Sequence, residues 1–114
     1  MKEGDVILTP LAQSDGKVKN RPAIILREMP PYKDFLVCGI STQLHQTVPG
    51  FDEMLTIGDD DFVSSGVISD SVIRLGFLAV LPKKKIIGSI GEISPERHKR
   101  LLNRLATYLI GNVK

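Results

Sequence analysis

Short apolar segments separated by Gly, Pro and Asp dominate the first three quarters of the 114-residue chain. Several of these segments are rich in β-branched residues, which favour strands. The turn-forming residues between them indicate that the chain reverses direction often. The pattern predicts strands at residues 6–8, 23–26, 35–41, 53–57, 71–74, 78–81 and 86–90.

The segment at residues 23–26 is apolar throughout and follows Pro22, which predicts a central strand. Pro30 and Pro31 mark a turn at residues 29–34, because proline removes backbone donors and fixes φ. Residues 35–41 should therefore return antiparallel to the central strand. Gly88 is a candidate bulge or bend in the last strand. Short strands joined by such turns are typical of a small barrel or sandwich.

The end of the chain changes to a helical pattern. Ser94, Pro95 and Glu96 supply a capping hydroxyl, a first-turn proline and an acid, so a helix should begin here. Gly111 should end it. The fold class expected is therefore mainly β with a C-terminal α-helix. One apolar stripe recurs at helical spacing and consists of Leu101, Leu102, Leu105, Leu109 and Ile110.

Three arginines, Arg97, Arg100 and Arg104, recur on a different face of this helix. Charged residues most often solvate a helix surface, so plain exposure is favoured over RNA binding for this face. His98 lies at helical spacing from the leucines, which places it beside the core.

The size and composition suit a single domain over residues 1–114, with an apolar content of 42%. Cys38 is the only cysteine, so it cannot form an internal disulfide, and its apolar surroundings indicate a buried small residue rather than a reactive thiol. The charged N-terminus does not resemble a signal peptide, and no apolar run approaches the length of a membrane span. We expect a cytoplasmic protein without membrane association.

The net charge is only +2, but the charges are unevenly distributed. Residues 51–70 hold six acids and no Lys or Arg, whereas residues 71–114 hold nine Lys or Arg against Glu92 and Glu96. A basic face on a nearly neutral protein fits a polyanionic partner. The three lysines at residues 83–85 are equally well explained as a solvated turn. The acidic stretch has no evident role in an RNA-binding protein.

Several kinds of site are absent from the sequence. It contains no Cys-x-x-Cys, no His-Glu-x-x-His, no phosphate-binding P-loop and no Gly-x-Ser-x-Gly elbow. The aspartates at residues 59–61 lack the alternating spacing of a calcium loop, so a solvated turn is the favoured interpretation. We therefore expect no metal and no cofactor. His45 lies in a polar loop, where it can contact a base or simply face solvent.

The segment from Gln13 to Pro22 is the strongest candidate for chemistry. Lys17, Lys19 and Arg21 stand at alternate positions, so in an extended segment all three should point the same way. Asn20 adds amide donors beside them, and the proline stiffens the connection to the central strand. Such a segment can close over a phosphate, and a guanidinium can donate two hydrogen bonds to it in a fixed geometry.

A second candidate lies at the end of the strand expected to pair with the central one. Ser41 and Thr42 bear hydroxyls there, and Gln43 follows them. Hairpin pairing would bring these side chains near Arg21, where they could bond a phosphate or hold the arginine. Each of these features, taken alone, is more often structural.

The set of motifs resembles the PemK/MazF family of toxin endoribonucleases over nearly the whole chain. The matching segments, in order, are GDVIL (residues 4–8), NRPAIIL (20–26), GISTQ (39–43), DSVIR (70–74), IIGSIG (86–91) and the final helix. The resemblance implies an SH3-like β-barrel of the PemK/CcdB type, a homodimer, and a cognate antitoxin whose disordered segment covers the active site and with which the toxin binds DNA. It also implies metal-independent cleavage of single-stranded RNA, leaving a 2′,3′-cyclic phosphate and a 5′-hydroxyl.

The resemblance also implies the catalytic residues. The arginine of the family's Arg-Pro step is catalytic, and here it is Arg21. The second catalytic residue is usually a threonine near the end of the third strand, and the matching position here is Ser41. Thr42 would serve if the register differed by one, although such a slip would turn its side chain to the other face. Substrate binding is expected from Lys17, Lys19, Asn20, Thr42, Gln43 and His45.

Two other functions remain possible from the sequence. A gyrase-poisoning toxin of the same architecture would bind a protein and cut no RNA. A non-catalytic barrel would only bind RNA or a protein. Neither function requires Arg21 to lie beside a hydroxyl, and neither would degrade RNA.

Overall fold

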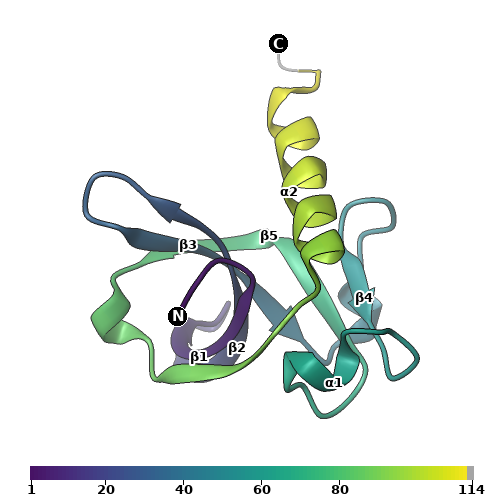
Figure 1. Cartoon of the computed structure of the whole chain (residues 1–114), viewed down its shortest axis with the longest axis horizontal. Coiled ribbons are helices and arrows are strands. Elements are labelled where there is room, and N and C mark those ends of the chain that lie inside the picture. Colours follow the sequence, from purple (N-terminus) through teal and green to yellow (C-terminus); the bar gives the residue numbers. More distant parts are fainter. Residues whose placement is uncertain (113–114) are drawn as a thin grey trace.

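The computed structural model describes residues 1–112 of the chain, and these form a curled sheet and a projecting helix (Figure 1). The helices are α1 (Phe62–Ser65) and α2 (Pro95–Ile110), with short 3-10 turns η1 (Leu44–Gln46) and η2 (Lys83–Lys85). The strands are β1 (Asp5–Ala12), β2 (Val18–Met29), β3 (Asp34–Ser41), β4 (Glu53–Leu55), β5 (Ser71–Leu81) and β6 (Gly88–Glu92).

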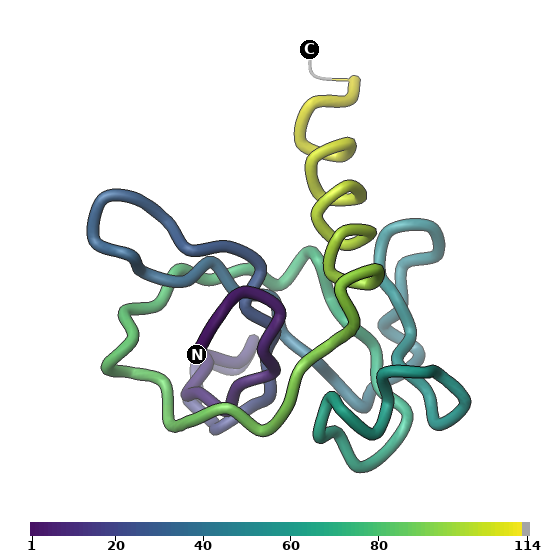
Figure 2. Tube along the Cα trace, viewed as in Figure 1, coloured from purple at the N-terminus to yellow at the C-terminus, as the bar shows by residue number. Residues whose placement is uncertain are grey.

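The six strands form one antiparallel sheet in the order β4-β5-β3-β2-β1-β6. The sheet curls into a half-barrel around β1 and β2, as Figures 1 and 2 show. The central position of β2 and its antiparallel pairing with β3 are confirmed, and so is the mainly β class with a C-terminal helix.

Each face of the sheet carries its own apolar core because strand side chains alternate between the two faces. Along β2, Ile24 and Leu26 contribute to the core beneath α2, whereas Ala23 and Ile25 contribute to the core inside the curl. Both faces of β2 are buried at these positions, which explains why residues 23–26 are apolar without interruption.

Helix α2 begins as predicted, with the Ser94 Oγ accepting a hydrogen bond from the Arg97 N–H at 3.1 Å. Leu101 and Leu105 are buried against the sheet. The predicted apolar stripe is wrong at its far end, where Leu109 and Ile110 are 63% and 81% exposed. Figure 2 gives the reason: the last turns of α2 extend beyond the sheet.

Four of the predicted strands need correction. Residues 71–74 and 78–81 belong to one strand, β5, and residues 56–57 lie outside β4. The last strand begins at Gly88 rather than Ile86, and its irregularity falls at Ile90, between the pairs Val6–Gly91 and Ile7–Ser89. His98 does flank the core, with its Nε2 2.8 Å from the Leu26 carbonyl oxygen. None of the helices within residues 1–112 has the length and apolar character needed to cross a membrane.

Candidate functional site

A pocket of about 470 Å³ opens where the end of β1 and the loop after it face the end of β3 and the middle of β5. None of the residues that line it is acidic, whereas two are arginines. The lining residues are Leu11, Ala12, Gln13, Ser14, Arg21, Gly39, Ile40, Ser41, Gln43, Gln46, Arg74 and Phe77.

Arg21 enters this pocket from β2, where it pairs across the sheet with Thr9 of β1. It is followed by Pro22 and by four buried residues of the same strand, so its backbone is held by the centre of the sheet. The Arg21 Nε is buried and has no hydrogen-bond partner within residues 1–112. A buried N–H donor without an acceptor is uncommon in proteins and costs free energy. This donor is therefore a candidate for bonding a ligand.

Ser41 reaches the same pocket from the last position of β3. The β2–β3 pairing ends at Ala23–Gly39, two residues from Arg21 on one strand and two from Ser41 on the other, and both residues line the pocket. Its Oγ accepts a hydrogen bond from the Gln43 N–H at 3.0 Å, which leaves the hydroxyl proton free to donate to a ligand. Gln43 also lines the pocket, whereas Thr42 does not.

Arg74 and Phe77 of β5 also line the pocket, although neither was predicted from the sequence as a site residue. The Arg74 guanidinium lies over the Phe77 ring, with its carbon 5.8 Å from the ring centroid. No carboxylate within residues 1–112 forms an ion pair with Arg74 or Arg21. Two cations without counter-charge, a hydroxyl and several amides suit a phosphate group.

The remaining predicted binding residues do not line this pocket. Lys19 and Asn20 are exposed residues of β2, and alternation places Lys19 on the same face as Arg21. Lys17 lies before β2, which begins at Val18. Strand alternation therefore gives Lys19 and Arg21 a common direction but does not extend to Lys17. His45 is an exposed residue of η1.

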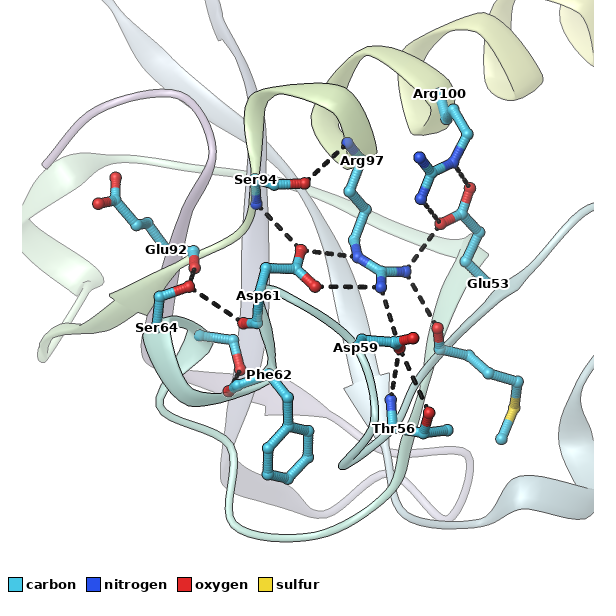
Figure 3. A network of polar contacts seen from close by, with 12 residues as sticks. Glu53, Thr56, Asp59, Asp61, Phe62, Ser64, Glu92, Ser94, Arg97 and Arg100 are labelled. Atoms are coloured by element: carbon cyan, nitrogen blue, oxygen red, sulfur yellow. Dashed lines mark hydrogen bonds and ion pairs between the residues drawn. The ribbon is translucent and has the colours of Figure 1, made fainter.

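A second group of arginines lies on α2, and its environment contradicts the solvated face expected from the sequence (Figure 3). The Arg97 side chain is only 7% exposed and bonds Asp61 Oδ2 at 2.8 Å through its Nε. Its terminal nitrogens reach Glu53 at 2.8 Å and Asp59 at 3.1 Å. Arg100 and Arg104 also contact Glu53. The expected solvated turn at residues 59–61 is likewise wrong, because Asp61 is buried.

Burial and ion pairing act against each other in this cluster. Burial raises the pKa of Asp61, but hydrogen bonds from Arg97 and from the Ser94 N–H outweigh it and hold the pKa below its ordinary value. Burial lowers the pKa of Arg97, yet its bond to Asp61 leaves that pKa raised. Both groups are therefore charged, and together they tie α2 to the segment around α1.

The acidic stretch at residues 51–70 acquires a structural role from these contacts. Apart from its ion pairs, it supplies acceptors for backbone donors: Asp52 accepts from the Val48 and Leu75 N–H groups at 2.9 and 3.0 Å, and Asp70 accepts from Ile57 at 2.9 Å. Part of the uneven charge distribution is thus neutralised inside the molecule. Lys83–Lys85 remain exposed in η2.

The potential metal ligands and the single thiol of the described residues do not form a second site. Residues 1–112 contain no group of three His, Cys, Asp or Glu side chains placed to hold a metal ion. Cys38 is buried, and burial raises its pKa to about 12, so its thiol is not activated.

Comparison with known proteins gives one match that covers most of the chain. The model of the family described as "PemK-like, MazF-like toxin of type II toxin-antitoxin system" matches residues 2–109. No curated protein sequence matches the chain.

Proposed function

The chain belongs to the PemK-like, MazF-like toxins of type II toxin–antitoxin systems, and from this premise we propose that it is an endoribonuclease that cuts single-stranded mRNA. The observation that carries the proposal is the buried Arg21 Nε without a partner, at a pocket with no acidic lining residue. An arginine donor held in this way favours a phosphate ligand. RNA presents such phosphates next to its own nucleophile, the 2′-hydroxyl.

The reaction needs no metal-bound water, because the 2′-oxygen attacks the adjacent phosphorus and the bond to the 5′-oxygen breaks. The products are a 2′,3′-cyclic phosphate and a 5′-hydroxyl. Arg21 stabilises the extra negative charge of the pentacoordinate state, and Ser41 donates its hydroxyl proton to a phosphate oxygen. Arginine stays protonated and is a poor general base. No His, Asp or Glu lines the pocket, so solvent carries the proton from the 2′-oxygen and supplies one to the leaving oxygen.

Arg74 supplies the second cation for the RNA backbone, and Gln43 supplies amide contacts beside Ser41. Lys17, Lys19, Asn20, Thr42 and His45 do not line the pocket, and their role is to steer or grip the flanking nucleotides. The family places the protein with an antitoxin, and we extend this to a cytoplasmic homodimer whose pocket an antitoxin segment covers.

The decisive experiment is incubation of the purified protein with a defined mRNA in excess EDTA, followed by mapping of the cut ends. We expect cleavage without added metal, with 5′-hydroxyl ends. Arg21→Ala should reduce the rate by about a hundredfold or more while the protein stays folded, since this is the usual loss for one preorganised charge contact.

Arg27→Ala is the matched control. Arg27 lies on the same strand, but it is 59% exposed and bonded to Glu3, so its removal should leave the rate unchanged. Intact RNA with the wild-type protein would favour a gyrase-poisoning toxin or a non-catalytic binding barrel. Full activity in a folded Arg21→Ala protein would contradict the assigned role of Arg21.

A further inference from the structure

Strand β5 is interrupted where it passes the pocket. Its pairing with β3 jumps from Cys38–Leu78 to Gly39–Arg74, so residues 75–77 have no partner on β3. Leu75 turns into the core beneath α2, and Phe77 packs against the core inside the curl. The interruption is anchored by Asp52, which is buried and accepts the Leu75 N–H at 3.0 Å. The bulge therefore directs Phe77 toward the pocket.

Gly39 leaves the space that the Phe77 ring occupies. A Cβ added at Gly39 would lie 3.0 Å from Phe77 Cδ1 and 3.4 Å from Cγ, which is tighter than most real contacts of this kind. The backbone of Gly39 has no positive φ, so its lack of a side chain serves the ring rather than a turn. The ring is thus seated directly on β3.

Among the hydrogen bonds, ion pairs and cation–π contacts within residues 1–112, the Arg74 side chain makes only the contact with the Phe77 ring. It forms no side-chain hydrogen bond and no ion pair there, and its guanidinium carbon lies 5.8 Å from the Phe77 centroid. An arginine over a ring is attracted by the π face but keeps its N–H edges available. Those edges can then donate to an anion without first breaking a bond to the protein.

We propose that Phe77, seated on Gly39, is a positioning residue that holds Arg74 ready to bind a backbone phosphate of the RNA. The inference rests on the proposed RNA-cutting function. It explains why one aromatic ring stands among the aliphatic, small, amide and cationic residues that otherwise line the pocket. A purely structural role for Phe77 would require only apolar volume, which leucine also provides.

The test measures binding of a single-stranded RNA that spans the mapped cut site and carries one 2′-deoxynucleotide at the attacking position. Phe77→Leu should weaken binding about two- to fivefold, the usual range for an exposed cation–π contact. It should also reduce the slope of log affinity against log salt by up to about 0.7, the value for one lost phosphate contact on a single strand. Phe77→Tyr, which keeps the ring, should restore both.

Two further variants separate positioning from packing. Adding Phe77→Leu to Arg74→Ala should cause no further loss of binding, because the two residues act through one contact. Phe62→Leu removes a partly buried ring from the other core, away from the pocket, and should leave the affinity and the salt slope unchanged. Wild-type affinity and slope in a folded Phe77→Leu protein, or full additivity with Arg74→Ala, would overturn the proposal.

A measurement without RNA tests the same contact. In the wild type, NMR should show Arg74 side-chain protons shifted upfield by the Phe77 ring, and the shift should vanish in Phe77→Leu and persist in Phe77→Tyr. Absence of the shift in the wild type would overturn the positioning role even if RNA binds. Failure of the wild type to bind RNA, with the shift present, would instead overturn the proposed function and the phosphate assignment that rests on it.

Discussion

Two groups of arginines in this molecule carry the same charge in opposite surroundings. The group on α2 is surrounded by carboxylates, with Arg97 bonded to three acids at 2.8 to 3.1 Å (Figure 3). The pocket group, Arg21 and Arg74, has no ion pair within the described part of the chain, and one of its buried donors has no partner.

This contrast identifies which arginines are available to a ligand. Arg97 is one of the most buried charged side chains of the protein, yet its charge is already neutralised by the acidic stretch. Arg21 is only half-buried but retains unused hydrogen-bonding capacity. A count of basic residues along the sequence does not distinguish these cases, because the distinction depends on which acids the fold brings close.

The largest effect is expected from removal of Arg97. Arg97→Ala leaves Glu53 and Asp61 buried with less counter-charge, and breaking a buried pair in this way costs about 3–5 kcal/mol. The free energy of unfolding, measured by urea denaturation, should fall by that amount. At urea concentrations below the new unfolding midpoint, RNA cleavage should be retained, because Arg97 does not line the pocket.

Arg100→Ala is the control on the same helix face. Its side chain is 52% exposed and bonds the same Glu53, so its removal should cost no more than about 1 kcal/mol. Equal losses in the two variants would show that burial does not separate these arginines. A cleavage defect in folded Arg97→Ala would show that the α2 group contributes to the site after all.

Much of the fold was predictable because its causes are local. Short apolar segments between Gly, Pro and Asp marked the strands, Pro30 and Pro31 marked a reversal, and Ser94 with Pro95 marked the start of α2. The bulge of β5 was not predictable, since it depends on a bond between Asp52 and the Leu75 backbone, 23 positions apart. The exposure of the last turns of α2 was also not predictable, because the sequence does not indicate where the sheet beneath a helix ends.

The candidate site was partly predictable for the same reason. Arg21, Ser41 and Gln43 could be selected from strand ends and family motifs, and the structure gathers them around one pocket. The bulge in β5 brings Arg74 and Phe77 to the pocket, and no local sequence pattern predicts that bulge. The roles of Asp59, Asp61 and Arg97 were missed because each side chain looks solvated until its long-range partner is known.

A smaller effect is expected at the hydroxyl beside the pocket arginines. Ser41→Ala removes a donor to a charged phosphate oxygen, a loss worth on the order of tenfold to a hundredfold in cleavage rate. Thr42→Ala should stay within about twofold, because Thr42 does not line the pocket and a neighbouring strand position faces the other way. Single-turnover rates on one RNA measure both. The reverse order would assign the hydroxyl role to Thr42.

The smallest effect concerns acid stability, and it separates the two arginine groups without a substrate. The pKa of Asp61 is lowered in the folded protein, so its contribution to stability is complete above the ordinary value of 3.8 and is lost as the pH falls through the folded pKa. The free energy of unfolding should therefore decrease below about pH 4 in the wild type. Asp61→Asn should be less stable near neutrality, and its free energy of unfolding should decrease less steeply in acid.

Arg21→Ala is the control and should keep the wild-type dependence on pH. Arg21 has no carboxylate partner within residues 1–112 whose protonation could release it. An unchanged acid slope in Asp61→Asn would mean that other carboxylates dominate, and that the ion pairs of α2 matter less to stability than their burial indicates.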